Sequence, residues 1–216
     1  RTAAMNAAER VESLAEFARL HWRRVALFLG VAGGIAVAVQ AAGPLSAMAV
    51  NRAFAADLGA IGHALGVITL VAALSSLPIA GIADRLLRGR FAERGRPMIM
   101  AAMAAAAVPC ILWFGWATDE RQALILLGGF TLVTCIGNAL IPTMLQDLVP
   151  ATLRARAFAA YSFVIAAFCA AGPVLAGAIA DHVTDHDLLV AIAAVAAPFL
   201  LLSAFSAALL SKLRQG

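Results

Sequence analysis

Six long apolar runs separated by short gaps constrain this chain more than any other feature of its sequence. Each run has about the 20 residues that an α-helix needs to cross the hydrocarbon core of a bilayer. The runs cover residues 25–50, 61–87, 98–117, 123–149, 157–180 and 188–210. Since the gaps leave no room for a soluble domain, we expect an all-α, polytopic membrane bundle of about six transmembrane helices.

Composition supports lipid as the solvent for most of the chain. Hydrophobic residues make up 63% of the 216 residues and charged residues 13%. A soluble domain averages about 45–50% apolar and about 25% charged residues. The net charge of +4 does not indicate nucleic-acid binding, because the basic residues lie in the gaps and form no soluble basic face. We expect no nucleic-acid partner.

The basic residues also predict an orientation. If the N-terminus is cytoplasmic, every lysine and arginine except Arg52 and Arg121 lies on the cytoplasmic side. Cytoplasmic loops of membrane proteins carry this excess. The sequence therefore predicts a multi-pass protein of the inner or plasma membrane with both termini in the cytoplasm.

The first 22 residues differ from the rest of the chain. Val11, Leu14, Ala18 and Trp22 recur at helical spacing, and charged residues fill the other face. This pattern predicts an amphipathic cytoplasmic helix along the membrane surface, with a solvated linker helix as the alternative. We therefore divide the chain into residues 1–22, a linker helix, and 23–216, a six-helix membrane domain.

The gap after the second run carries a cluster of charged residues with two glycines. It reads Gly-Ile-Ala-Asp-Arg-Leu-Leu-Arg-Gly-Arg, and its notable members are Gly81, Asp84, Arg85, Arg88 and Arg90. This stretch resembles the cytoplasmic loop signature of the major facilitator superfamily, although Ala80 stands where the family has its first glycine and one extra residue precedes the second. The resemblance implies that the cluster latches helices together in one conformation.

Asp84 lies where the second apolar run ends, at the expected membrane boundary. A carboxylate at a membrane boundary is costly unless it is paired or faces water. Asp84 can accept hydrogen bonds from Arg85, from Arg88 or from the N-terminus of a neighbouring helix. The alternative is that the basic residues of this gap only set the topology.

Two later stretches also resemble the superfamily. The gap after the fourth run contains Asp147, Pro150 and Arg154, and the fifth run contains Gly172, Pro173 and Gly177. The first set implies a matching latch in a second three-helix repeat. The glycines permit close helix approach, with ordinary packing as the alternative reading. Residues 137–154 are similar to the Spinster-like branch, which includes exporters of sphingosine phosphate and lysophospholipids.

The resemblance implies the C-terminal half of a transporter with two inverted three-helix repeats. We expect a secondary transporter that works by alternating access on a small organic, amphiphilic or lipid-like solute. Its expected partners are the bilayer, a missing N-terminal six-helix half and a coupling ion, with a proton as the candidate. No cofactor is implied, and no phosphate-binding loop for ATP occurs in the sequence.

In the resembled fold, the first and fourth helices line the substrate path. The polar residues on these helices are the expected lining, because polar groups in lipid face the interior or a water-filled cavity. They are Gln40, Asn51, Thr131, Thr134 and Asn138. Hydrogen bonding between helices, without a ligand role, is the alternative.

Two rival functions are a membrane enzyme acting on lipids and a structural membrane subunit. An enzyme needs clustered His, Asp or Ser, and the Asp181 and Asp185 pair lacks the upstream carboxylates of a two-metal site. We therefore expect neither catalysis nor a bound metal. Another six-helix block upstream of this sequence would separate the half-transporter from a free-standing structural subunit.

Overall fold

The chain forms a bundle of long helices. The computed structural model describes residues 13–91 and 95–213, and the side chains of residues 87–91 lie outside that description. All regular secondary structure in these residues is helical. A short helix α2 (Leu14–Leu20) precedes α3 (Trp22–Phe54), α4 (Leu58–Phe91), α5 (Gly95–Gly115), α6 (Glu120–Leu148), the 3-10 turn η2 (Ala151–Leu153), α7 (Arg154–His182) and α8 (Leu188–Leu213).

The expected membrane spans are confirmed. Among the described residues, the six long helices are each long and apolar enough to cross a bilayer. Most extend beyond the predicted run by several residues, because polar residues at their ends continue the helix past the hydrocarbon core. The all-α fold class is therefore confirmed.

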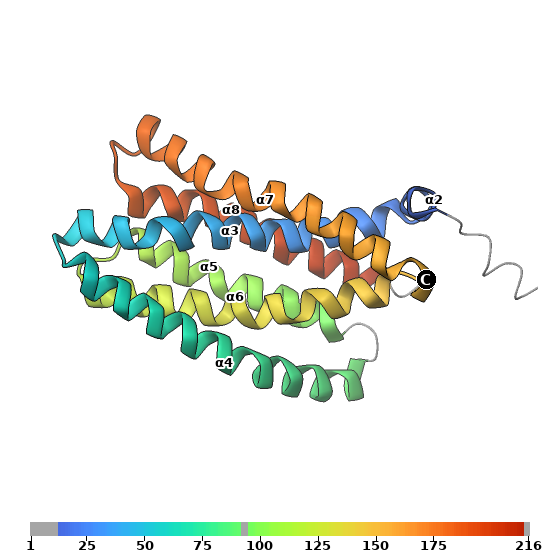
Figure 1. Ribbon diagram of the computed structural model, residues 1–216. Helices are drawn as coiled ribbons and strands as arrows, with labels where there is room; N and C mark the ends of the chain where they lie inside the picture. Colours follow the sequence, from blue (N-terminus) through green and yellow to red (C-terminus); the bar gives the residue numbers. More distant parts are fainter. Residues whose placement is uncertain (1–12, 92–94, 214–216) are drawn as a thin grey trace, which may run out of the picture.

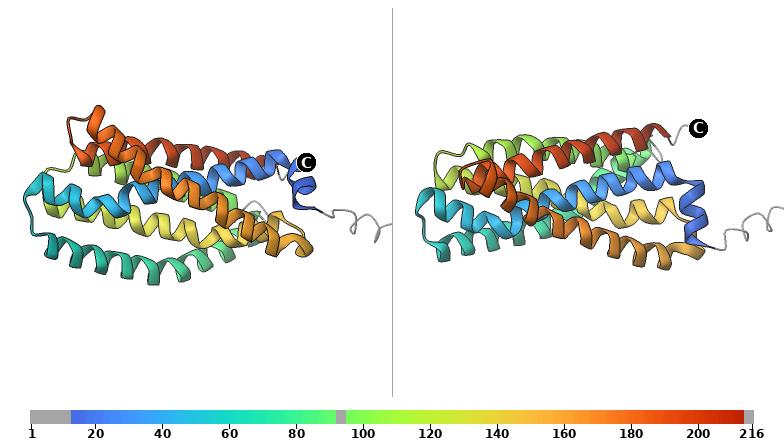
Figure 2. Two further views of the ribbon diagram at one scale, coloured as in Figure 1. Left: turned by 45° about the horizontal axis from the view of Figure 1, so that its top comes forward. Right: turned by 90° about the horizontal axis from the view of Figure 1, so that it is seen from above.

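The two halves of the chain pack as related three-helix units. Helix α8 lies between α3 and α5, α7 packs on α3, and α4 packs on α6 (Figures 1 and 2). The second helix of each unit thus packs on the first helix of the other unit. This exchange is the contact pattern that two inverted repeats, α3–α5 and α6–α8, produce.

The two ends of the bundle differ in charge. We call the end that holds α2, the end of α4, the start of α5, the α6–α7 junction and the last turn of α8 the basic end (Figure 1). At the opposite end, aspartates cap three of the helices by accepting backbone N–H hydrogen bonds, which would otherwise lack partners. The bonds run from Ala60 to Asp57 (2.7 Å), from Gln122 to Asp119 (2.8 Å) and from Leu189 to Asp187 (3.0 Å).

Helix α2 packs on the bundle at its basic end. Ser13 caps it by accepting the Glu16 N–H at 3.1 Å, and Phe17 is 5% exposed within the core. Leu14 and Ala18 share this inward face, as their spacing suggests. Trp22 instead begins α3 and is exposed, because the chain turns at His21. Leu14 and Ala18 of the expected apolar face therefore point toward the bundle and Trp22 does not, while residues 1–12 lie outside the described residues.

Burial is uneven among the six long helices. Only 17% of the most apolar stretch of α4 and of α7 is buried, against 56% for α3 and α8. Helix α4 exposes a continuous apolar face, with Leu70, Leu74 and Leu77 all more than half exposed. Such faces need lipid or another protein surface to cover them.

Candidate functional site

A cavity of about 220 Å³ lies between α3, α4 and α6. Its wall is mostly apolar and includes Phe130, which is 2% exposed. Its polar lining residues are Ser46, Thr69, Thr131, Thr134, Cys135 and Asn138. None of the described lining residues carries a charge. Three of the five expected residues, Thr131, Thr134 and Asn138, therefore share one cavity.

Most of the cavity hydroxyls are bonded within their own helices. Ser46 Oγ donates to the Gly43 carbonyl at 3.1 Å. Thr131 Oγ1 donates to the Leu127 carbonyl at 2.7 Å. Thr134 Oγ1 lies 2.8 Å from the Phe130 carbonyl and 3.1 Å from the Thr131 carbonyl. Each of these hydroxyls therefore donates its hydrogen bond to a carbonyl of its own helix. Such a bond allows a single hydroxyl group to lie in an apolar helix without a partner on another helix.

The structure places Gln40 and Asn51 outside the lining of this cavity. Asn51 Nδ2 donates to the Ala56 carbonyl at 2.7 Å and so fixes the turn after α3. Gln40 is half-buried where α3 meets α7. Helix α3 instead lines the cavity with residues including Val39, Gly43 and Ser46. The face of α3 that lines the cavity is therefore shifted by one residue from the expected face, which began at Gln40. The lining residues Ser46, Phe130 and Cys135 were not among the expected residues.

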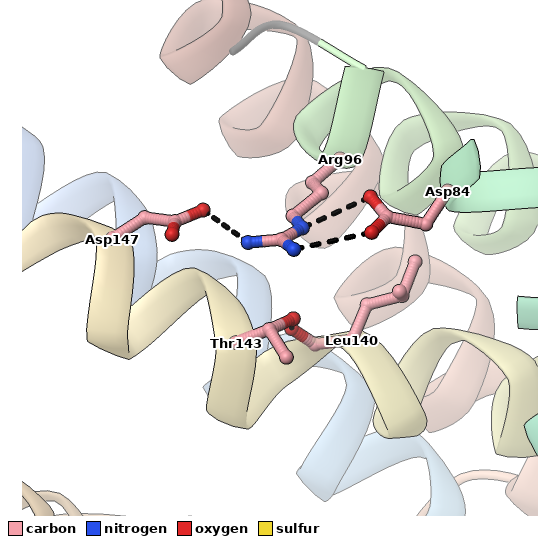
Figure 3. A network of polar contacts seen from close by, with 5 residues as sticks. All are labelled: Asp84, Arg96, Leu140, Thr143 and Asp147. Atoms are coloured by element: carbon pink, nitrogen blue, oxygen red, sulfur yellow. Dashed lines mark hydrogen bonds and ion pairs between the residues drawn. The ribbon is translucent and has the colours of Figure 1, made fainter. Parts of the chain in front are cut away.

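A buried arginine joins three helices at the basic end (Figure 3). Arg96, in the first turn of α5, is 9% exposed. Its Nε and Nη2 donate to the two carboxylate oxygens of Asp84 at 2.9 and 3.1 Å, and its Nη1 donates to Asp147. Asp84 lies on α4 and Asp147 in the last turn of α6. The planar guanidinium suits this arrangement, because it presents donors to two carboxylates at once.

Among the described side chains, Asp84 pairs with Arg96, whereas Arg85, Arg88 or the N-terminus of a neighbouring helix was expected. Arg85 is exposed and forms no ion pair with any described residue. Arg85 follows Asp84 directly, so its side chain leaves the helix in another direction. The signal that could have identified Arg96 is its position beside Pro97, at the start of the third apolar run.

The remaining latch candidates lie around this network. The side chains of Arg88 and Arg90 lie outside the described residues. Gly81 faces open space on α4. Pro150 precedes η2, and Arg154 begins α7 with an exposed side chain. The second repeat offered three latch candidates, Asp147, Pro150 and Arg154. Among the described residues, only Asp147 of these three forms an ion pair that links the two repeats.

The two glycines of α7 have different surroundings. A Cβ at Gly172 would lie 2.6 Å from the Val37 carbonyl oxygen and 2.7 Å from the Ala41 nitrogen. Only glycine allows the backbones of α3 and α7 to approach so closely. A Cβ at Gly177 would meet nothing within 4 Å. Pro173, directly after Gly172, is half-buried inside α7.

The family follows from a comparison with family models. The model of the Major Facilitator Superfamily matches residues 27–215, nearly the whole membrane domain. The chain belongs to the Major Facilitator Superfamily. It is therefore a membrane transporter protein of that superfamily, and its six helices are consistent with one half of the superfamily fold. No curated protein and no solved structure is significantly similar to it.

The acidic and histidine residues at the opposite end of this superfamily protein form one exposed pair. His186 Nδ1 lies 3.6 Å from Asp181 Oδ1, and both side chains are more than half exposed. Within residues 13–91 and 95–213, no group of three or more His, Cys, Asp or Glu side chains is arranged to hold a metal ion.

Proposed function

We propose that this chain is one half of a secondary active transporter that moves a small organic, amphiphilic solute by alternating access. The observation that carries the proposal is the uncharged cavity between α3, α4 and α6. Its mostly apolar wall suits a hydrocarbon portion, and its hydroxyl and amide groups suit a polar head. The Spinster-like pattern in residues 137–154 favours the same class of solute.

The missing half is the proposed partner of α4 and α7. Both helices expose most of their apolar stretches, and Gly81 presents open space on α4. A second six-helix domain packed on these helices would close the cavity on its remaining side. Lipid would then cover the other faces of the bundle.

The network of Asp84, Arg96 and Asp147 is the proposed latch. It ties α4, α5 and α6 together at one end of the bundle, and α4 is one of the two helices proposed to contact the other half. The network is small and only partly exposed, so it favours one access state without binding substrate. A coupling ion, such as a proton, would have to act through the other half, because none of the described residues lining the cavity is charged.

The proposed orientation places the basic end in the cytoplasm, since basic loops are retained there. In the full-length protein with a cysteine-free background, we expect a cysteine at Arg85 to resist a membrane-impermeant maleimide added to intact cells. A cysteine at Asp185 should react. Both native side chains are exposed, so accessibility in the fold does not limit either reaction. If position 85 is labelled and position 185 is not, the protein has the opposite orientation.

Transport is tested directly with full-length protein in liposomes. A fluorescent single-chain amphiphile should accumulate faster in these liposomes than in protein-free ones, and an imposed proton gradient should increase the rate if a proton is coupled. The matched control is Arg96→Gln protein, which should insert equally but turn over slowly. Equal fluxes in all three preparations would contradict the proposal.

A further inference from the structure

We propose that the cavity between α3, α4 and α6 selects amphiphiles whose head donates hydrogen bonds and carries positive charge, such as an organic ammonium group, over those with anionic heads. This proposal rests on the transport function proposed above and specifies its substrate class. The preference follows from the balance of hydrogen-bond donors and acceptors in the cavity lining, and not from the cavity volume.

The inner wall offers hydrogen-bond acceptors. A hydroxyl has one proton and two lone pairs. Ser46, Thr131 and Thr134 already donate their protons to carbonyls of their own helices. Ser46 and Thr134 are 2% and 4% exposed, so their protons cannot turn to water instead. What these three groups present to a ligand is therefore oxygen lone pairs.

A proline adds an acceptor next to this wall. Pro142 lies inside α6 and Pro44 inside α3. Proline has no N–H, so the carbonyl four residues earlier loses its ordinary helical donor. The carbonyl freed by Pro142 belongs to Asn138, which lines the cavity. The one freed by Pro44 belongs to Gln40, which lies against α7 and adds nothing to this wall. The buried Phe130 ring also lines the cavity, and the face of an aromatic ring attracts cations.

Few donors balance these acceptors. Thr69 and Asn138 can donate, but both are exposed residues and Asn138 accepts equally well, while the Cys135 thiol is only a weak donor. No described lining residue is lysine, arginine or histidine. An anion entering this space would lose hydration without gaining a positive partner, which is costly. An ammonium head would exchange water for several oxygen acceptors.

Cys135 provides a readout that does not depend on transport, because it lines the same cavity. The test uses full-length protein in lipid nanodiscs with Cys135 as its only cysteine. Alkylation of Cys135 by N-ethylmaleimide is timed in the presence of dodecylammonium, dodecanol or dodecanesulfonate, which share one chain length. The acceptor-deficient variant carries Ser46→Ala, Thr131→Val and Thr134→Val.

The control variant is Ser76→Ala. Ser76 is 5% exposed and donates to the Ala73 carbonyl at 2.9 Å, so it has the same kind of bond but lies outside the cavity lining. We expect dodecylammonium to protect Cys135 at a concentration at least about tenfold below that of dodecanesulfonate, the ratio that one charge-assisted hydrogen bond supplies. The preference should persist in Ser76→Ala and fall to near unity in the triple variant.

The outcomes separate this inference from the function on which it rests. Equal or better protection by the sulfonate would overturn the donor preference while leaving an amphiphile site in place. An unchanged preference in the triple variant would show that bilayer partitioning, not the hydroxyls, sets it, and would also overturn the inference. Failure of all three compounds, including neutral dodecanol, would contradict the amphiphile site itself.

Discussion

Arg96→Gln is expected to slow transport by the full-length protein more than any other single change in the charged network, with substrate affinity nearly unchanged. Glutamine cannot bind both carboxylates as the guanidinium does, so α4 and α6 lose their common partner on α5. A coupling of about 1–3 kcal/mol would shift the balance of access states by about 5–150-fold. Uptake rates at saturating substrate, with binding measured separately, test this.

Two further variants sharpen the prediction. Asp84→Asn keeps the side-chain shape and removes one of the two charges, so its effect should have the same direction and be smaller. Arg85→Gln is the matched control, because Arg85 is adjacent, exposed and without an ion pair to the described residues. If Arg85→Gln and Arg96→Gln lower the transport rate equally, the charged residues act only by setting the membrane topology and the network is no latch. Loss of binding in Asp84→Asn would make that residue part of the substrate site.

Gly172→Ala is expected to destabilise the membrane domain. The new Cβ would lie within 2.7 Å of two backbone atoms of α3, and backbone cannot move aside as a flexible side chain can. Overpacking of this kind costs about 1–3 kcal/mol. We expect a lower yield of folded full-length protein and a lower midpoint of thermal unfolding in detergent.

Gly177→Ala is the matched control on the same helix. Its Cβ would enter open space, so alanine should be neutral or slightly stabilising there, because it is the better helix former. If both substitutions lower the unfolding midpoint equally, the close approach of α3 and α7 is not what requires glycine. A neutral Gly172→Ala would lead to the same conclusion.

Much of the fold follows from the sequence, because a bilayer restricts the possible structures so strongly. Once lipid is the solvent, backbone groups must be satisfied inside helices, and run length then fixes the spans. Of the lysines and arginines, only Arg52 and Arg121 lie in the gaps on one side, and all the others lie on the other side. This asymmetry predicts which helix ends lie on the same side of the membrane.

The details of the site depend on helix rotation and on neighbours far apart in the chain. Gln40 and Val39 are adjacent in sequence, yet Val39 lines the cavity, because the close approach at Gly172 sets how α3 faces its neighbours. Arg96 and Asp147 lie 51 positions apart. No periodicity within one helix encodes such a pair, so the sequence predicted the carboxylate but not its arginine.

The central position of α8 determines when this domain can assemble during synthesis. Ser203 on α8 donates to the Val31 carbonyl on α3 at 2.9 Å, across 172 residues of chain. Helices α3 and α5 therefore enter the membrane well before the helix that packs between them has left the ribosome. During that interval their small-residue faces, such as the one at Gly34, must be covered by lipid or by the insertion machinery. For α3 and α5, insertion and complete packing are thus separate events, because their contacts with α8 form only after α8 has been inserted.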